Sequence, residues 1–430
     1  MKPLVRILAA ALAVTACSLP GGTQPMALTA ENDLNALRRF SQVIDIVGKN
    51  YVNEVSEAEL IDNALKGMLQ NLDPHSDMLT AKEFNELHET TSGEFFGLGV
   101  EITTDNGQLL VVSPIADTPA DKAGMLSGDH ILSINGESTL EMSLTDAVSK
   151  MRGPKGTEVT LVVLHKNEAK PVTMTLKRDA IPLISVKSQE VEPGYHWIRL
   201  TRFSERSTPE MTKALSAASE KGPVKGIVLD LRNNPGGLVD QCVNVADMFL
   251  SGGTIVSMRG RHEDDQRFYT AHSESSDVSA PLVVLVNAGS ASASEILAGA
   301  LRDQNRAIIV GERTFGKGSV QNIIPLSDGS GLKLTIARYY TPSGRSIQAE
   351  GIEPDFLVTW EPPSDQEQPS IMIREQDLNR HLAGKSDRKT NDRKLSPEEQ
   401  KSADEALARD NQLRMALQLV KTVPVMKNLK

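Results

Sequence analysis

The spacing of apolar residues along the chain changes twice, and each change marks a different kind of structure. Residues 34–51 and 57–72 repeat apolar side chains every three or four positions, which predicts two amphipathic helices. Between residues 93 and 179 the apolar residues form short runs separated by turn residues, which predicts a small β-rich domain. From residue 194 onward strands alternate with helices, as in a layered α/β domain. The expected fold class is therefore a multidomain α+β protein.

Individual elements follow from the same pattern. In the β-rich region we expect strands at residues 99–103, 108–112, 130–134, 159–164 and 172–177. In the α/β region we expect strands at residues 226–231, 254–258, 281–286, 306–310 and 331–340, and helices at 238–250 and 294–303. Residues 397–420 return to helical spacing and predict one closing helix.

Composition places the boundaries between these regions. Lys2 and Arg6 flank the start of an apolar run, and small residues follow it, which is typical of a secretory signal. The next stretch is rich in Pro, Gly and Thr and reads as a tether, and a polar, charged stretch near the end is expected to be a flexible linker. In order, we expect a signal peptide (1–16), a tether (17–30), an N-terminal helical region (31–92), the β-rich domain (93–180), the α/β core (181–360), the linker (361–396) and a C-terminal helical segment (397–430).

The two cysteines have different expected roles. Val14-Thr15-Ala16-Cys17 resembles the bacterial lipobox, in which the cysteine becomes the lipidated first residue of the mature protein. By the same resemblance, Ser18 favours sorting to the outer membrane, so we expect a lipid-anchored protein of the bacterial periplasm. Cleavage to a soluble periplasmic protein is the alternative. Cys242 then has no disulfide partner, and its helical spacing indicates a core residue.

Charge and histidine spacing exclude several classes of function. The formal net charge is −10, which argues against a nucleic-acid-binding protein. None of the eight histidines falls in a metal-binding spacing, so we expect neither a metal nor another cofactor. After the signal region, no apolar run is long enough to span a bilayer.

A candidate nucleophile follows the expected strand at 281–286. A strand, a turn of small residues and a helix present a hydroxyl beside free backbone N–H groups that can stabilise an oxyanion. Ser290, Ser292 and Ser294 all lie in this turn, and local chemistry does not separate them. The structural alternative is that Ser292 and Glu295 form a helix capping box.

Lys317 is a candidate base because glycines flank it and allow close packing and partial dehydration. To act near neutral pH, its pKa must fall by about 3 units, or about 4 kcal/mol, which burial is able to supply. An exposed loop lysine is the alternative. Residues 311–317 also approach a phosphate-binding loop, but Gly318 replaces the required Ser or Thr and a strand is expected next, so we reject nucleotide binding.

Three stretches together resemble the carboxyl-terminal processing (tail-specific) protease family. They are Leu-Asp-Leu-Arg-Asn-Asn-Pro-Gly-Gly at 229–237, Ser-Ala-Ser-Ala-Ser-Glu at 290–295 and Gly-Lys-Gly-Ser-Val-Gln at 316–321. Residues 340–345 and 351–355 are similar to the family's closing motifs, and the resemblance covers roughly 34–355.

The resemblance implies a serine endopeptidase with a Ser/Lys dyad. Ser292 becomes the nucleophile, Lys317 the base and Gln321 the residue that orients the lysine. The backbone N–H groups of Gly237 and Ala293 become the oxyanion hole. The main alternative is a scaffold or adaptor that carries a peptide-binding (PDZ) domain and has no catalytic activity. Such a protein would not need Ser292, Lys317 and Gln321 together.

The β-rich region looks like a PDZ domain rather than a generic small β-domain. Gly97, Leu98, Gly99 and Val100 take the position of the loop that binds a chain-terminal carboxylate. The expected partners are protein substrates with accessible C-terminal tails, and Arg152 is a candidate relay between bound tail and active site. The family resemblance further implies a homo-oligomer built through the terminal helices and, in some members, an activating adaptor protein.

Overall fold

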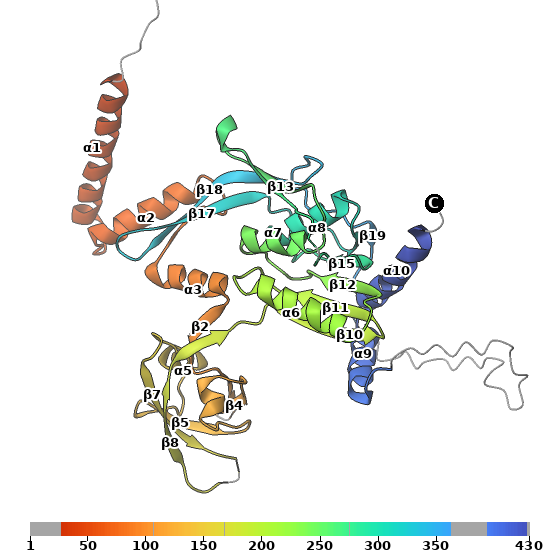
Figure 1. Cartoon of the computed structure of the whole chain (residues 1–430). Coiled ribbons are helices and arrows are strands. Elements are labelled where there is room, and N and C mark those ends of the chain that lie inside the picture. The colour runs from red at the N-terminus through yellow and green to blue at the C-terminus, as the bar shows by residue number, and fades with distance from the viewer. Residues whose placement is uncertain (1–26, 106, 167, 275, 363–393, 428–430) are drawn as a thin grey trace, which may run out of the picture. The chain divides into compact units, whose positions relative to one another are not determined.

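The structure is a computed structural model that describes residues 27–105, 107–166, 168–274, 276–362 and 394–427 (Figure 1). The expected signal peptide, Cys17, most of the tether and most of the 361–396 linker lie outside these residues. The chain divides into two compact units, residues 1–72 and 73–430, and each is considered by itself. In the part that the structure describes, no helix is long and apolar enough to cross a membrane.

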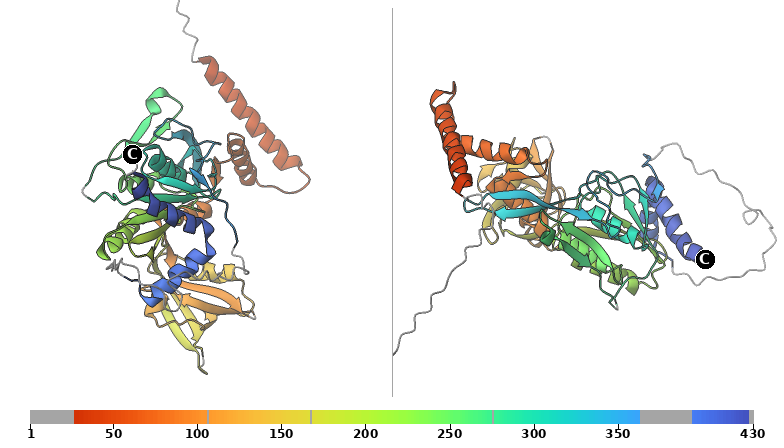
Figure 2. Two further views of the ribbon diagram at one scale, coloured as in Figure 1. Left: turned by 90° about the vertical axis from the view of Figure 1, so that its right-hand side faces the viewer. Right: turned by 90° about the horizontal axis from the view of Figure 1, so that it is seen from above.

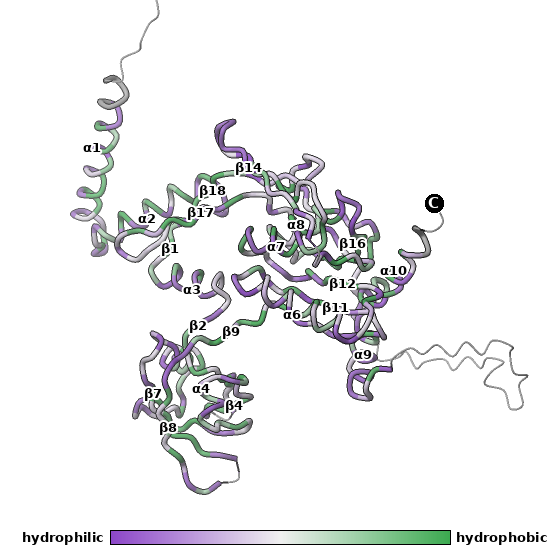
Figure 3. Tube along the Cα trace, in the orientation of Figure 1, coloured by the Kyte–Doolittle hydropathy of each residue, from purple (hydrophilic) through white to green (hydrophobic). Residues whose placement is uncertain are grey.

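The first unit contains the two helices that the apolar spacing predicts. They are α1 (Ala27–Asn50) and α2 (Glu57–Gln70), and the Ser56 hydroxyl caps α2 by accepting from the Glu59 amide. Apolar and polar residues alternate along α1 (Figure 3). Five of its large apolar residues are exposed: Leu34, Leu37, Phe40, Val43 and Ile46. Packing within the unit therefore leaves these residues uncovered.

A six-stranded sheet forms the α/β core of the second unit, in the order β10-β11-β12-β15-β16-β19. The first pair is antiparallel and all later pairs are parallel. The strands are β10 (Val186–Glu192), β11 (Tyr195–Leu200), β12 (Gly226–Asp230), β15 (Leu282–Val286), β16 (Ile308–Gly311) and β19 (Phe356–Leu357). The sequence predicted β12, β15 and β16 but missed β10, β11 and the short β19.

Helices cover both faces of this sheet, so its central strands are buried on both sides. On β12 and β15, alternate residues enter different cores: Ile227 and Leu229 face one side, whereas Val228 faces the other. The first face packs against α6 (Ser207–Glu220), α7 (Val239–Asp247) and α8 (Ala293–Asp303), and the second packs against α9 (Pro397–Arg409) and α10 (Asn411–Lys427) (Figures 1 and 2). Burial on both faces explains why these strands are continuous apolar runs.

The prediction of one closing helix at 397–420 was wrong, because the chain breaks at Asp410. This residue has an extended backbone (φ −129°, ψ 98°), and its carboxylate accepts from the Leu413 amide at 2.9 Å, which caps α10. The apolar residues Leu413, Ala416, Leu417 and Val420 of α10 pack on the sheet.

The β-rich domain contains every strand that was predicted for it. They are β3 (Val100–Asp105), β4 (Gln108–Pro114), β5 (His130–Ile134), β7 (Glu158–Leu164) and β8 (Val172–Lys177), with the short β6 (Glu137–Ser138) beside β5. Two helices, α4 (Pro119–Lys122) and α5 (Leu144–Met151), complete it. The chain enters through β2 (Glu94–Gly97) and leaves through β9 (Asp179–Pro182), and these two strands pair with each other.

A further five-stranded sheet contains the strand after the candidate base. Its strands are β1 (Asp77–Leu79), β13 (Thr254–Arg259), β14 (Arg267–Thr270), β17 (Ser319–Pro325) and β18 (Gly331–Tyr340). The turn before β1 is fixed by Asp73, whose carboxylate accepts from the His75 and Ser76 amides and from the Thr335 hydroxyl of β18. Helix α3 (Ala81–Ser92) follows β1.

Candidate active site

The three segments that carry the family resemblance begin at the carboxyl ends of neighbouring strands. β12 leads into residues 231–237, β15 into residues 287–292, and β16 into residues 312–318. Because these strands are parallel and adjacent, their carboxyl ends lie at one edge of the sheet, the usual place for a site in such a fold. Segments far apart in sequence are thereby brought together.

Burial separates the three candidate serines, which the sequence could not do. Ser290 and Ser294 are fully buried, and their hydroxyls donate to the carbonyls of Leu231 (2.8 Å) and Asn234 (2.9 Å). Ser292 is partly exposed and has φ +54° and ψ −114°, a conformation that side-chain-bearing residues rarely adopt. Such strain is typical of an exposed nucleophile on a turn between a strand and a helix.

Glu295 is a candidate site residue that sequence reasoning missed, since it entered only as half of a capping box. It does receive the Ser292 amide at 2.8 Å, so the capping interpretation is correct for the backbone. The same buried carboxylate also accepts from the amides of Gly316 (2.7 Å) and Lys317 (2.8 Å) and from the Thr314 hydroxyl. One carboxylate therefore joins the nucleophile turn to the lysine loop.

Lys317 is half-buried, as a lysine base requires. Burial lowers its pKa below the ordinary value of 10.5, the positive charge of Lys333 lowers it further, and the charge of Glu295 opposes both effects. Burial and then the positive charge of Lys317 also lower the pKa of His75, in the turn before β1. The loop is thus an environment that disfavours the charged ammonium.

Gln321 lies on β17, four residues after the lysine. Its amide nitrogen donates to the Ser319 hydroxyl at 2.8 Å and more weakly to the Thr335 hydroxyl at 3.4 Å. Among the described residues it has no hydrogen bond to Lys317, so its orienting role stays a prediction. A strand follows Lys317, where a phosphate-binding loop would require a helix.

The expected oxyanion-hole amides have no acceptor within the described residues. The Phe203 amide donates to the Gly236 carbonyl (3.0 Å), and the Phe203 carbonyl accepts from the Leu238 amide (2.9 Å). The Gly237 amide lies between these two bonds and therefore points away from Phe203. A Cβ on Gly236 would lie 2.9 Å from the Ser292 Cβ, which shows that this loop runs directly beside the candidate nucleophile. Ala293 begins α8, where amides lack intrahelical partners.

The β-rich domain has a groove where its resemblance places a peptide-binding site. The cavity is about 200 Å³ in volume and is lined by the expected loop and by α5; its lining residues include Gly97, Leu98, Gly99, Val100, Leu144, Val148 and Arg152. The amides of Leu98 and Gly99 have no acceptor in the described part of the chain, whereas their carbonyls are occupied. Free amides beside an apolar groove suit a chain-terminal carboxylate.

Arg152 connects this groove to α3. Its guanidinium lies 3.1 Å from the Glu89 carboxylate of that helix and 4.6 Å from the centre of the Phe95 ring. Because Arg152 also lines the groove, a bound peptide would change the surroundings of this ion pair.

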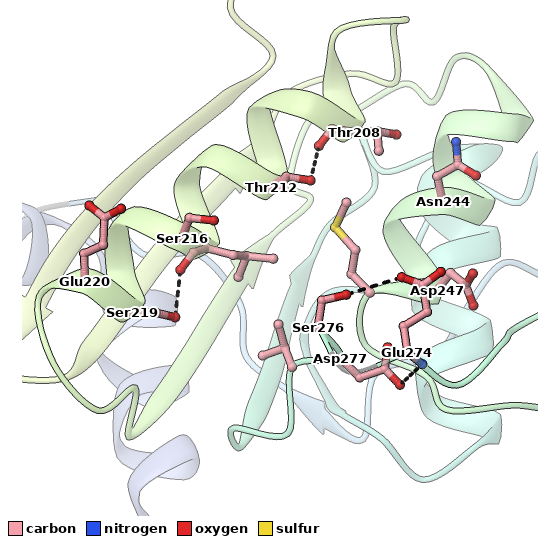
Figure 4. A pocket seen from close by; sticks show the side chains of 13 residues that line it. Thr208, Thr212, Ser216, Ser219, Glu220, Asn244, Asp247, Glu274, Ser276 and Asp277 are labelled. Carbon is pink, nitrogen blue, oxygen red and sulfur yellow. Dashed lines mark hydrogen bonds between the residues drawn. The ribbon is translucent and has the colours of Figure 1, made fainter.

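A separate cavity of about 650 Å³ lies between α6, α7 and residues 274 and 276–278 (Figure 4). Its walls are mainly hydroxyl and acidic side chains, and none of the expected site residues lines it. Thr212 and Ser219 donate back to carbonyls of their own helix, and Asp277 accepts from the Glu274 amide. Its polar groups are therefore largely satisfied internally.

Comparison with known proteins identifies three regions of the chain. Residues 194–358 match the model of peptidase family S41, residues 110–165 match a PDZ domain, and residues 21–82 match the activating protease CtpB N-terminal domain. The three matches follow one another in the order that the sequence pattern predicted for its regions.

Relatives match most of the chain. The carboxy-terminal-processing protease of Bartonella bacilliformis is 44% identical over 366 residues, which are 84% of this chain and 84% of the relative. The carboxyl-terminal-processing protease of Synechocystis sp. is 42% identical over 73% of this chain and 72% of its own. The carboxy-terminal processing protease CtpA of Bacillus subtilis is 36% identical over 74% of this chain and 67% of its own.

We predict that Glu295→Gln lowers the free energy of unfolding by roughly 2–4 kcal/mol, because it removes the charge and turns an amide group toward buried donors. Urea denaturation measures this. Glu312→Gln is the matched control, since its carboxylate accepts one bond, from the Trp360 amide, and a loss under about 1 kcal/mol is expected. Equal losses in the two variants would contradict the central place given to Glu295.

Proposed function

Because the chain belongs to peptidase family S41, as a carboxy-terminal processing protease with a PDZ domain, we propose that it hydrolyses peptide bonds with a Ser292–Lys317 dyad. The observation that carries the proposal is the sharing of Glu295: one buried carboxylate holds both the strained serine and the half-buried lysine loop. The neutral Lys317 amine accepts the proton as the Ser292 oxygen attacks the substrate carbonyl. It then gives the proton to the leaving amine.

The remaining groups act on the charge that develops in this reaction. The amides of Gly237 and Ala293 donate to the oxygen of the tetrahedral intermediate. These hydrogen bonds are stronger than those to the ground-state carbonyl, because the oxygen then carries a negative charge. Since the Gln321 amide nitrogen is engaged by Ser319, its carbonyl oxygen is the group left to accept from Lys317 and orient it. Water then attacks the acyl-enzyme, with the lysine again acting as base.

We predict that Ser292→Ala and Lys317→Ala each lower kcat/KM by about 10³-fold or more on an unfolded protein substrate. Because only the neutral amine is a base, activity should rise with pH through a midpoint below 10.5, the ordinary lysine value. Lys333→Ala removes a like charge, raises the pKa of Lys317 and should move that rise to higher pH.

The matched control for the pH profile is Lys82→Ala, an exposed lysine on α3 whose removal should leave the midpoint in place. Full activity in Ser292→Ala or Lys317→Ala would exclude the dyad. It would also favour the alternative of a PDZ-bearing scaffold whose protease-like domain is not catalytic.

We further propose that the PDZ domain selects substrates by their C-terminal tails. The free amides of Leu98 and Gly99 bind the terminal carboxylate, and the apolar groove between them and α5 takes the last side chain. Cleavage then begins on chains whose tails are accessible. Occupation of the groove is relayed through Arg152, which lies against both the groove and Glu89.

We predict that Arg152→Ala keeps tail-peptide affinity within about threefold but reduces stimulation of cleavage by that peptide by about fivefold or more. Fluorescence anisotropy gives the affinity, and hydrolysis of a tailless reporter with added peptide gives the stimulation. Lys150→Ala is the control, because it is also at the end of α5 but pairs with Glu137 within the PDZ domain. Unchanged stimulation in Arg152→Ala would contradict the relay.

The exposed apolar residues of α1 support assembly of the chain with a second copy of itself. Leu34, Leu37, Phe40, Val43 and Ile46 are exposed in a unit too small to cover them, and a second copy would bury part of this apolar surface. We predict a dimer or larger oligomer in analytical ultracentrifugation, and dissociation by Leu37→Glu with Phe40→Glu. Arg38→Ala, on the same helix, should not dissociate it. A monomeric wild type would contradict this proposal.

The sequence also supports a proposal on where the protein is located. We place the mature protein in the bacterial periplasm, anchored to the outer membrane by lipid on Cys17. Incorporation of a fatty-acid analogue in wild type but not in Cys17→Ser tests the anchor. From the family resemblance we also propose an activating adaptor protein, and stimulation of the purified enzyme by cell extract would indicate one.

A further inference from the structure

The guanidinium of Arg232 joins two distant parts of the chain just before the oxyanion loop, residues 233–237. It donates from Nε and Nη2 to the Asp230 carboxylate (2.9 and 2.7 Å) and from Nη1 and Nη2 to the Asp410 carboxylate (3.0 and 2.6 Å). A fifth bond runs from Nη1 to Gln412 Oε1 at 2.8 Å. An arginine has five N–H donors, and here all five are used by a side chain that is only 9% exposed.

Two of the three acceptors come from the C-terminal helical segment. Asp410 lies at the break between α9 and α10, and Gln412 is in the first turn of α10. Gln412 is itself buried and held, because its side-chain nitrogen donates to the Val358 carbonyl at 2.7 Å. The apolar face of α10 is packed into the core beneath the sheet. The acceptors are therefore fixed by the fold and do not depend on surface side chains.

The other side of Arg232 is connected to the nucleophile turn. The Asn233 amide donates to the Asn287 side chain at 2.9 Å. The Asn234 carbonyl accepts from the Ala291 amide at 3.0 Å and from the Ser294 hydroxyl at 2.9 Å. The oxyanion loop is thus bonded to the nucleophile turn through Asn233 and Asn234. The residue just before it, Arg232, is anchored by the C-terminal helical segment.

We propose that Asp410, with Gln412, is a positioning residue of the protease: it fixes Arg232 and through it the Gly237 amide that receives the oxyanion. The C-terminal helices are then required for turnover although they supply no group that touches substrate. This inference rests on the proposed oxyanion hole. Since an oxyanion donor acts chiefly in the transition state, loss of its alignment lowers kcat and leaves KM and tail binding nearly unchanged.

The experiment compares Asp410→Ala with wild type in the full-length protein. The expected result is a fall in kcat of about tenfold or more, a change in KM below about twofold, and the same midpoint of the pH–rate profile, because Lys317 is not disturbed. Labelling of Ser292 by a fluorophosphonate should slow in parallel. Asp404→Ala is the matched control: this exposed aspartate of α9 accepts from the Gln400 side chain and should leave kcat unchanged.

A folded Asp410→Ala protein, judged by circular dichroism, with unchanged kcat would overturn the inference, as would a shifted pH midpoint. If this variant does not fold, Gln412→Leu tests the inference in its place. It removes one of the five hydrogen bonds of the Arg232 guanidinium, and the inference requires a smaller but measurable loss of kcat. Ser292→Ala is measured alongside. Activity in Ser292→Ala refutes the proposed dyad, whereas an inactive Ser292→Ala with a fully active Asp410→Ala refutes only the role of Asp410.

Discussion

The arrangement of the active site depends on one buried carboxylate. Glu295 accepts hydrogen bonds from the Ser292 amide on one side and from the Lys317 amide on the other. A buried charge is tolerated only when its hydrogen bonds are satisfied, so the carboxylate draws both segments around itself. One contact therefore ties the strained turn that carries Ser292 to the loop that carries the half-buried Lys317.

The parallel sheet makes this contact reachable. β12, β15 and β16 end side by side, so the oxyanion loop, the nucleophile turn and the lysine loop start from neighbouring positions at one edge. Helices on both faces bury the strands. The strain at Ser292 can persist because the turn around it is held by many independent bonds, including those of Ser290 and Ser294.

Sequence patterns predicted the elements whose apolar period is clear, such as β5 and β18, and the resemblance supplied the candidate dyad. They did not separate Ser290 from Ser292, because that distinction depends on burial and on the partners Leu231 and Asn234, which are some 60 residues away in the chain. The second role of Glu295 was hidden for the same reason. The break at Asp410 was missed because helical spacing continues across it; in the structure its carboxylate caps α10 and accepts from Arg232.

The most direct test of this account is the titration of Lys317 itself. Its side-chain carbon and nitrogen shifts can be followed by NMR in the full-length Ser292→Ala protein, with assignment by Lys317→Arg. The account predicts a pKa below the ordinary value of 10.5, since burial and Lys333 outweigh the charge of Glu295. A pKa at or above 10.5 would mean that the amine stays charged where the reaction needs a base, and it would contradict the central claim.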